Sequence, residues 1–378
     1  MRTNALGVSM PMSAISLRPE LCLVIPVLNE RDNIAPLVAL IDGVLAGIAW
    51  EVIFVDDDSR DGTRTAIAEV AAQHPNVRLL HRIGRRGLAS AFVEGAQASL
   101  APLIAAMDGD LQHDERLLPQ MVEALRGGAY DIAMGSRHVA GGGLGDWDKT
   151  RAGMSDLATR LSRMVLKTPV SDPMSGFFMI RRPVFEQAVR GLSAIGFKIL
   201  LDIIASLPTP PRIKELPYVF RTRVAGESKL DAGVLRDFAL LLLDKMIGHL
   251  VPVTFVMFAS VGALGIAAHL IVLRLALTLG HMPFSEAQLV ATAVAILGNF
   301  ILNNIFTFGD RRLRGWGLLR GFLTFAAICA VGAIGNLGVA GFLFGPAGSS
   351  WWVAGVVGAG MSLVWNYAVS SVFTWRRK

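Results

Sequence analysis

The sequence is poor in cysteine and in charged residues. It has only two cysteines, Cys22 and Cys329, among 378 residues, and 17% of its residues are charged. Two cysteines exclude a framework of several disulfides and a cysteine-based zinc site. The small charged fraction, together with 53% hydrophobic residues and a mean hydropathy of +0.50, excludes an ordinary soluble enzyme.

Two common sequence signals are also missing. Residues 1–20 contain no apolar run of signal-peptide length, so we expect a disordered lead-in there. No G-x-G-x-x-G follows the first predicted strand, which argues against a dinucleotide site. The net charge of +6 is better explained by membrane topology and phosphate-bearing substrates than by nucleic acid, which we do not expect as a partner.

The apolar residues are concentrated in the second part of the chain. Up to about Tyr218 apolar and charged stretches alternate, as in a globular domain. Beyond about His249 the chain is dominated by apolar segments of about 20 residues, the length that crosses a bilayer as a helix. We predict a soluble domain over residues 21–230, an amphipathic helical region at 231–248 that lies at the membrane interface or packs on the domain, and a membrane domain at 249–378.

The membrane domain contains four predicted spans, and its loops indicate their orientation. The loop Gly309–Arg320 and the terminal WRRK are rich in Arg and Lys, whereas the other two loops contain neither. The positive-inside rule therefore places the basic loop, both termini and the soluble domain in the cytoplasm, at the inner membrane. The predicted spans are Val251–Leu275, Leu289–Phe308, Leu318–Phe344 and Trp351–Trp375.

The ends of the second and fourth spans repeat one another. NFILNNIFTF (Asn299–Phe308) and NYAVSSVFTW (Asn366–Trp375) share Asn, Phe, Thr and aromatic residues in register. This repeat predicts two parallel helical hairpins. The intramembrane asparagines either bind a ligand or bond helices together, and we favour the second role. No intramembrane acidic pair or proton relay is present, which favours an anchor over a domain that flips lipid-linked sugars.

Short apolar runs alternate with amphipathic stretches of helical length in the soluble domain. This alternation predicts an α/β fold, Rossmann-like, with a mostly parallel central sheet. Ligands of such sheets bind beyond the carboxyl ends of the strands, so informative residues should follow each run. The predicted strands are Leu21–Leu28, Glu51–Asp56, Val77–His81, Leu103–Asp108 and Asp131–Ser136.

Two aspartates follow the fourth of these strands. Asp108 and Asp110 would share one face of an extended tip, where two carboxylates ionise together only at a cost. A divalent cation removes that cost, and oxygen ligands suit Mg²⁺ or Mn²⁺. Gln112 supplies a third oxygen. The alternative role, a helix cap, fits Asp114 better.

Acidic residues also follow the first two strands. Glu30, Asp56 and Asp57 at neighbouring strand ends are suited to bind the base and ribose hydroxyls of a nucleotide. Their alternative roles are structural: Asn29 would cap a helix, and the Asp61-Gly62-Thr63 stretch would form a turn.

Taken together, these stretches resemble family-2 glycosyltransferases, and more closely the polyprenyl-phosphate hexose synthases of the dolichyl-phosphate mannose synthase type. The resemblance extends over most of residues 21–229, and the membrane half is similar to a GtrA-like domain. Asp108-Gly109-Asp110 departs from the family's D-A-D without losing a ligand, and Arg85-Arg86 replaces smaller residues. The matching stretches are PVLNERDN, VDDDSRDGT, RRGLASAFVEG, MDGDLQH, GSRHVAGGG, SDPMSGFF and FRTRVAGESK.

The resemblance implies a role for each matched residue. Pro26, Asn29, Glu30, Asp56, Asp57 and Asp108 would bind the nucleotide sugar, and Asp108, Asp110 and Gln112 the metal. Catalysis would depend on Asp110 as a metal ligand. It would also depend on Arg137 and Arg223, because positive charge must bring two anionic substrates together. The lipid phosphate would be bound by Arg137, Arg151, Ser175, Arg223, Ser228 and Lys229.

The resemblance therefore implies inverting transfer of mannose from GDP-mannose to dolichyl or undecaprenyl phosphate. The same reaction with UDP-glucose or another UDP-sugar is the alternative. A processive polysaccharide synthase is not favoured, because its Q-x-x-R-W motif is missing from the chain.

Overall fold

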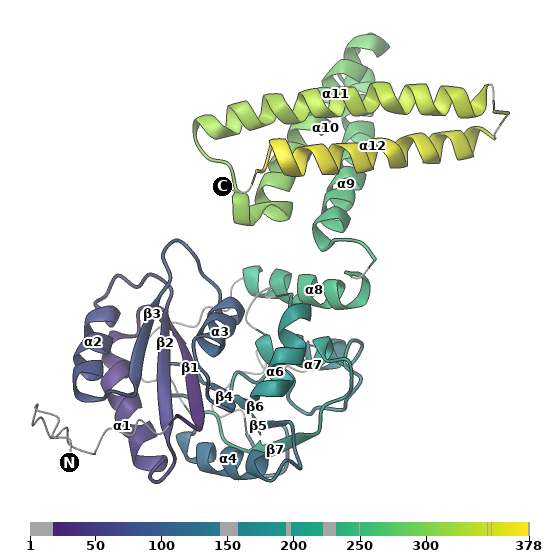
Figure 1. The fold of residues 1–378 in the computed structure, drawn as a ribbon. Coiled ribbons are helices and arrows are strands. Elements are labelled where there is room, and N and C mark those ends of the chain that lie inside the picture. The colour runs from purple at the N-terminus through teal and green to yellow at the C-terminus, as the bar shows by residue number, and fades with distance from the viewer. Residues whose placement is uncertain are drawn as a thin grey trace, which may run out of the picture. The chain divides into compact units, whose positions relative to one another are not determined.

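The computed structural model describes most of the chain, in two compact units. The described residues are 18–143, 158–193, 198–221, 232–248, 250–345, 347–348 and 350–376, and of residues 232–236 and 310 only the backbone is described. The units are Met1–Met246 and Ile247–Lys378, and each is described by itself (Figure 1).

The first unit is built on a seven-stranded sheet with the order β3-β2-β1-β4-β6-β5-β7. β1 pairs in parallel with β2 and β4, β3 pairs in parallel with β2, and β5 pairs in parallel with β7; β6 is antiparallel to β4 and β5. The prediction of an α/β fold with a mostly parallel sheet is confirmed. The strands are β1 (Leu21–Val27), β2 (Trp50–Asp56), β3 (Val77–His81), β4 (Leu103–Ala106), β5 (Ile132–Ser136), β6 (Phe178–Arg181) and β7 (Ile213–Pro217).

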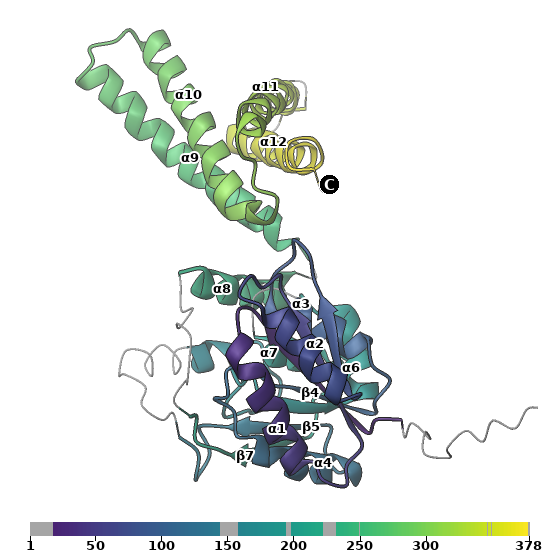
Figure 2. The ribbon, with the colours of Figure 1, turned by 90° about the vertical axis from the view of Figure 1, so that its left-hand side faces the viewer.

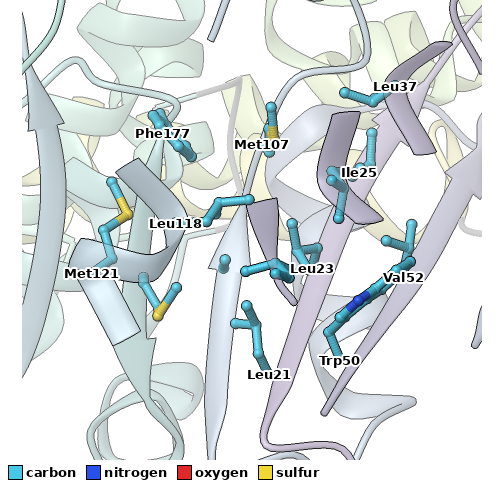
Figure 3. Packing of buried hydrophobic residues seen from close by; sticks show 14 of the residues in the cluster. Leu21, Leu23, Ile25, Leu37, Trp50, Val52, Met107, Leu118, Met121 and Phe177 are labelled. Carbon is cyan, nitrogen blue, oxygen red and sulfur yellow. The ribbon is translucent and has the colours of Figure 1, made fainter. Parts of the chain in front are cut away.

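Helices cover both faces of this sheet because its strands are apolar on both sides. Leu23 of β1 belongs to a buried cluster with residues of α1 and α4, whereas Val24 belongs to a second cluster with residues of α3, α6 and α7. Figure 3 shows part of the first cluster. The helices are α1 (Ile34–Val44), α2 (Thr63–Gln73), α3 (Leu88–Gln97), α4 (Leu118–Arg126), α6 (Arg182–Ala188) and α7 (Ile199–Ser206).

α8 (Ala232–Ile247) closes the first unit by packing on the loop that precedes β6. Phe238 and Leu241 are buried in a cluster with Met174 of that loop and Leu201 of α7. The Lys245 ammonium lies 2.6 Å from a carboxylate oxygen of Asp202, which fixes the end of the helix. The helix therefore has a protein-facing apolar side, and its placement at the membrane interface stays a prediction.

The second unit contains four helices that are long and apolar enough to span a membrane. α9 pairs with α10 and α11 with α12 to form two hairpins (Figure 2). α10 continues into a short π-helix, Asn303–Thr307. The protein is therefore a membrane protein. The helices are α9 (Val253–Thr278), α10 (Phe284–Leu302), α11 (Trp316–Phe344) and α12 (Trp351–Phe373).

Asn304 joins segments of this unit, the role that the sequence analysis favoured for the intramembrane asparagines, whereas the side-chain oxygens of Asn299 and Asn366 have no hydrogen-bond partner among the described residues. The Asn304 side-chain oxygen accepts hydrogen bonds from the Leu313 backbone N–H at 2.8 Å and from the Trp375 indole N–H at 3.1 Å. Asn304 thereby fastens the end of α10 to the start of the basic loop and to the end of α12.

Candidate active site

The loop after β4 holds the three predicted metal ligands in a fixed arrangement. β4 ends at Ala106, two residues before the predicted strand end, so Asp108 and Asp110 lie in the loop. The Asp110 carboxylate is buried and accepts a hydrogen bond from the Gln112 backbone N–H at 3.2 Å. The Gln112 amide nitrogen donates to the Arg221 carbonyl oxygen at 2.9 Å, which turns the amide oxygen away from that bond. The loop thus has the oxygen donors that a hard cation requires.

His113 contacts Asp108 of this loop and fixes its position. Its Nδ1 accepts a hydrogen bond from the Asp108 backbone N–H at 3.1 Å, and its Nε2 lies 3.5 Å from a carboxylate oxygen of Asp108. The ring is buried and stacks on Phe177, with ring centroids 5.0 Å apart. His113 therefore fixes both the backbone and the side chain of Asp108, a role that the sequence did not reveal.

Glycines let neighbouring segments approach the same loop closely. A Cβ on Gly109 would lie 3.0 Å from Val27 Cγ1 and 3.8 Å from the Pro26 carbonyl oxygen, so this residue packs on the end of β1. A Cβ on Gly176 would lie 3.3 Å from an Asp108 carboxylate oxygen. These glycines bring β1 and the loop before β6 against the predicted metal ligands.

The ends of β1 and β2 are tied together by side chains predicted to bind the nucleotide. The Asn29 side-chain oxygen accepts a hydrogen bond from the Arg60 backbone N–H at 3.0 Å. The Glu30 backbone N–H donates to Thr63 Oγ1 at 3.0 Å, and the Glu30 carboxylate accepts from the Asn33 amide at 2.7 Å. Asn29 thus links two loops and makes no helix cap.

Asp56 and Asp57 are both buried at the end of β2. Asp56 is 0% exposed and accepts from the Ser59 backbone N–H, so it shapes the turn. Asp57 accepts from the Gly87 backbone N–H at 2.8 Å and lies 3.2 Å from the buried Arg82 guanidinium. Burial raises the pKa of Asp57, against the lowering effect of these two partners. Asp57 therefore joins the β2 end to the Gly87 loop.

Backbone strain is concentrated at three of these loops. Among the described residues, Asn29, Asp58, Leu111 and His281 are the non-glycine residues with positive φ. The first three follow β1, β2 and β4 at the same edge of the sheet. Such conformations persist only where the surroundings enforce them, and they cluster at functional sites.

Arg137 follows β5 and forms a buried ion pair with Asp172. The guanidinium donates from Nε and Nη2 to the two carboxylate oxygens, each at 2.7 Å, and the Arg137 backbone N–H donates to the same carboxylate at 3.2 Å. Burial opposes the charge of both groups, but their mutual hydrogen bonds and charges prevail, raising the pKa of Arg137 and lowering that of Asp172. Arg137 also lies over the Phe220 ring, 5.7 Å from its centroid. Arg137 is therefore held rigidly as a cation.

Ser175 lies in the same loop as Asp172 and is buried. Its hydroxyl donates to the Gly135 carbonyl oxygen at 2.8 Å and accepts from the Phe177 backbone N–H at 3.2 Å. These bonds hold the loop before β6 against the end of β5. Asp172 was missed by the sequence analysis, although it lies in the SDPMSGFF stretch, because nothing local shows that its partner is Arg137.

The structure brings together the predicted residues that follow β1, β2, β4 and β5 and that precede β6. The remaining predicted residues are outside the described part of the chain. Asp114 caps the short helix Glu115–Leu117 by accepting from the Arg116 backbone N–H, which confirms its predicted structural role. The predicted residues that lie outside the described part of the chain are Arg151, Arg223, Ser228 and Lys229.

Comparison with known families gives a match for each of the two units. Residues 22–188 match the model of glycosyl transferase family 2, and residues 257–375 match that of the GtrA/DPMS transmembrane domain. The class is thus a glycosyltransferase with a membrane domain. The glucosyl-3-phosphoglycerate synthase of Mycobacterium tuberculosis, solved with phosphoglyceric acid, is 19% identical with a TM-score of 0.46, over 60% of this chain and 80% of that one.

Curated relatives narrow the class further. The dolichol-phosphate mannosyltransferase of Pyrococcus furiosus is 34% identical over 357 residues, which cover 93% of this chain and 98% of the relative. The enzyme of the same name from Saccharomyces cerevisiae is 37% identical over 228 residues, 58% of this chain and 84% of the relative. The chain belongs to the dolichol-phosphate mannosyltransferase family and is a glycosyltransferase of this type.

Proposed function

We propose that the enzyme transfers mannose from GDP-mannose to the phosphate of dolichol or undecaprenol, with inversion at the anomeric carbon. The observation that carries the proposal is the loop after β4, where Asp110 is bonded to Gln112 and where Asp108 is close enough to the rigidly held Arg137 for its charge to raise the Arg137 pKa. An acidic metal loop suits the diphosphate of the donor, and a fixed guanidinium suits the phosphate of the acceptor. The family membership supports mannose as the transferred sugar and a polyprenyl phosphate as the acceptor.

Mg²⁺ or Mn²⁺ would be held by Asp108, Asp110 and Gln112. The fit rests on the donor set: two carboxylates and an amide whose nitrogen is already bonded to the Arg221 carbonyl oxygen. Among the described residues no group of three or more His, Cys, Asp and Glu side chains surrounds a metal position, so diphosphate oxygens and water would complete the shell. When bound, the cation offsets the charge that develops on the departing nucleoside diphosphate.

The nucleoside would be bound at the ends of β1 and β2. Pro26, Asn29, Glu30 and Asp57 line this part of the edge, with Asp56 acting through the Ser59 turn. Because the β1 and β2 loops are fixed to one another before the donor binds, little ordering remains to be done when the nucleotide enters.

The acceptor phosphate would be bound on the opposite side, beyond β5 and β6. Arg137 would pair with a phosphate oxygen, and Ser175 would keep the loop in place, with Arg151, Arg223, Ser228 and Lys229 adding further contacts. A phosphate monoester carries about −1.5 to −2 charges at neutral pH, so its oxygen attacks without a strong general base. The protein's task is to neutralise and orient two anions.

The reaction would take place at the cytoplasmic face of the inner membrane, with both termini on that side. The support is the basic loop Gly309–Arg320, which the positive-inside rule assigns to the cytoplasm. Residues 231–248 would lie at the interface, and the four helices would anchor the enzyme.

A donor assay tests the proposal against its UDP-sugar alternative. The purified full-length protein, a polyprenyl phosphate and Mg²⁺ or Mn²⁺ are incubated with radiolabelled GDP-mannose or UDP-glucose, and label extracted into organic solvent is counted. We expect lipid-linked label from GDP-mannose, none without the polyprenyl phosphate, and a large excess over UDP-glucose. Transfer from UDP-glucose alone would refute the mannose assignment.

A truncation tests the role of the membrane helices. A chain ending at Ile247, assayed in detergent with a soluble short-chain polyprenyl phosphate, should retain transfer if the helices only anchor the enzyme. Loss of transfer by a truncated protein that still binds the nucleotide would contradict the anchoring role.

A further inference from the structure

A cavity of about 750 Å³ lies in the membrane unit between the start of α11 and the end of α12. Its size is that of a ligand site rather than a packing defect. The side chains that matter are Arg320 and Thr324 of α11, Thr374 and Arg376 at the end of α12, and the apolar Leu313 and Phe373. The cavity thus combines two cations, two hydroxyls and an apolar wall.

Charged residues line the cavity at only one of the two ends of the α11–α12 hairpin that have a described cavity. A smaller cavity at the other end of α11 and α12, about 350 Å³, is lined by apolar and small residues such as Leu337, Phe344 and Trp351, with no charged residue. Arg320 and Arg376 therefore mark one membrane face. Basic pockets between transmembrane helices on the cytoplasmic side are typical binding sites for lipid headgroups.

An unpaired hydroxyl also points to a ligand. Thr374 is 6% exposed, and within the described part of the chain its hydroxyl has no hydrogen-bond partner, nor has that of Ser370 one helical turn earlier. Buried polar groups are nearly always bonded, so a buried hydroxyl on a cavity wall requires an explanation. The hydroxyl oxygen itself is shielded from solvent, so it would reach a phosphate oxygen in the cavity by rotation of the Thr374 side chain.

The repeated hairpin provides an internal control. Thr307 corresponds to Thr374 in the repeat, and its hydroxyl donates to the Asn303 side chain at 2.7 Å. The residue that corresponds to Asn303 is Ser370, whose shorter side chain makes no such bond. The first hairpin therefore satisfies its threonine internally, and the second leaves its threonine without a partner among the described residues.

The arginines differ between the two hairpins in the same way. By the register of the repeat, Val253 corresponds to Arg320 and Gly309 corresponds to Arg376. The first hairpin therefore has neither cation at the equivalent place. Loss of the internal hydrogen bond and gain of two arginines occur together, in one copy of the repeat.

We propose that this cavity binds the phosphate headgroup of a membrane lipid, with Arg320, Arg376 and Thr374 as phosphate ligands and the lipid chain along Leu313 and Phe373. The site lies within the membrane unit and is assigned independently of the transfer reaction. A monoester phosphate should bind more tightly than a diester, because it carries more charge and two guanidinium groups face it.

The test measures lipid binding to the full-length protein in neutral detergent. Native mass spectrometry or calorimetry follows titration with phosphatidic acid, phosphatidylglycerol, phosphatidylcholine or inorganic phosphate. We expect affinity to decrease from phosphatidic acid to phosphatidylglycerol to phosphatidylcholine, and inorganic phosphate alone to bind at least tenfold more weakly than phosphatidic acid. The order separates a lipid headgroup from free phosphate.

Charge-matched variants locate the site. The double variant Arg320→Gln/Arg376→Gln should lose at least tenfold in affinity for phosphatidic acid, since each charge-assisted hydrogen bond is worth about a factor of ten or more. The variant Arg312→Gln/Arg314→Gln removes the same charge from the loop that precedes α11, where neither residue lines the cavity, and it should bind normally.

A threonine pair keeps the test valid if the arginine variants fold poorly. Thr374→Val removes no hydrogen bond found in the described structure, so it should melt like the parent protein in phosphatidylcholine and bind phosphatidic acid several-fold more weakly. Thr307→Val breaks the bond to Asn303, so it should melt earlier and bind normally. Equal binding of phosphatidic acid and phosphatidylcholine would overturn the proposal, as would equal losses in the cavity and control variants.

Discussion

The two sides of the active-site edge use buried carboxylates differently. Beside β1 and β2, Asp56 and Asp57 accept hydrogen bonds from the backbone N–H groups of Ser59 and Gly87. Beside β5 and β6, Asp172 accepts from a guanidinium. On the first side the carboxylates shape loops, and the guanidinium paired with Asp57, that of Arg82, also donates to the Gly87 carbonyl oxygen and so belongs to the loop. On the second side a carboxylate orients Arg137, the predicted phosphate ligand. The fold thus uses the same residue type to tie loops together in one half and to hold a guanidinium in the other, with the loop after β4 between them.

The largest effect should come from the loop that separates the two halves. Asp110→Ala removes a proposed metal ligand, and several kcal/mol of charge stabilisation should be lost, so turnover should fall by about a thousandfold. Metal-dependent label transfer measures this effect. Normal metal-dependent turnover in this variant would contradict the assignment of the loop.

The next effect should come from the ion pair on the acceptor side. Asp172→Asn leaves the buried Arg137 without its countercharge, which should lower the free energy of unfolding by about 3 kcal/mol. Turnover should fall as well, because Arg137 is no longer held. Denaturant unfolding and label transfer measure the two effects. A variant that melts like the parent protein would show that the pair is not stabilising.

The same pair predicts a pH dependence of stability. The pKa of Asp172 is lowered in the folded protein, so the stabilisation is present above the unfolded pKa of about 4 and is lost as pH falls through the lowered folded value. Unfolding measured between pH 6 and pH 3 should therefore be less acid-sensitive in Asp172→Asn than in the parent protein. Identical pH profiles would contradict the lowered pKa.

A smaller effect should follow from the support of Asp108. His113→Phe keeps an aromatic ring against Phe177 but removes the acceptor for the Asp108 N–H. Affinity for Mn²⁺ in the presence of the donor nucleotide should fall by about 10- to 100-fold, as for other groups that orient metal ligands. His113→Asn, whose amide oxygen can accept that N–H, should recover part of the affinity. Unchanged Mn²⁺ binding in His113→Phe, measured by calorimetry, would limit His113 to packing.

The smallest effect should come from the close contact between the loop after β4 and the end of β1. Gly109→Ala places a Cβ 3.0 Å from Val27 Cγ1, and relieving that contact should cost about 1 kcal/mol of stability and a few-fold in turnover. Gly127→Ala is the control, since a Cβ there meets nothing within 4 Å. Equal effects of the two substitutions would show that the approach of the loop to β1 does not matter.

The sequence predicted the parallel core of the sheet because its strands are buried on both faces and read as apolar runs. It did not resolve β6, a strand of four residues. α10 begins at Phe284, directly after Pro283 and before the predicted span that starts at Leu289, among residues less apolar than the rest. Periodicity and composition do not reveal a strand of four residues or the exact start of a helix whose first turn is of mixed polarity.

The candidate site could be predicted as a set of loops but not as a set of contacts. The positions after β1, β2 and β4 follow from the rule that ligands bind at the carboxyl ends of parallel strands. The Arg137–Asp172 pair depends on an antiparallel strand that brings a distant loop back to the same edge. The role of His113 depends on which ring nitrogen faces the backbone, which no motif records.

The left-handed backbone of Leu111 limits which residues can replace it. A leucine with φ of +62 is strained, and glycine adopts that conformation without strain. Glycine would relieve the strain, but it would also remove the packing of Leu111 on the core and loosen the chain between Asp110 and Gln112. The strained leucine therefore keeps the connection between these two predicted metal ligands stiff.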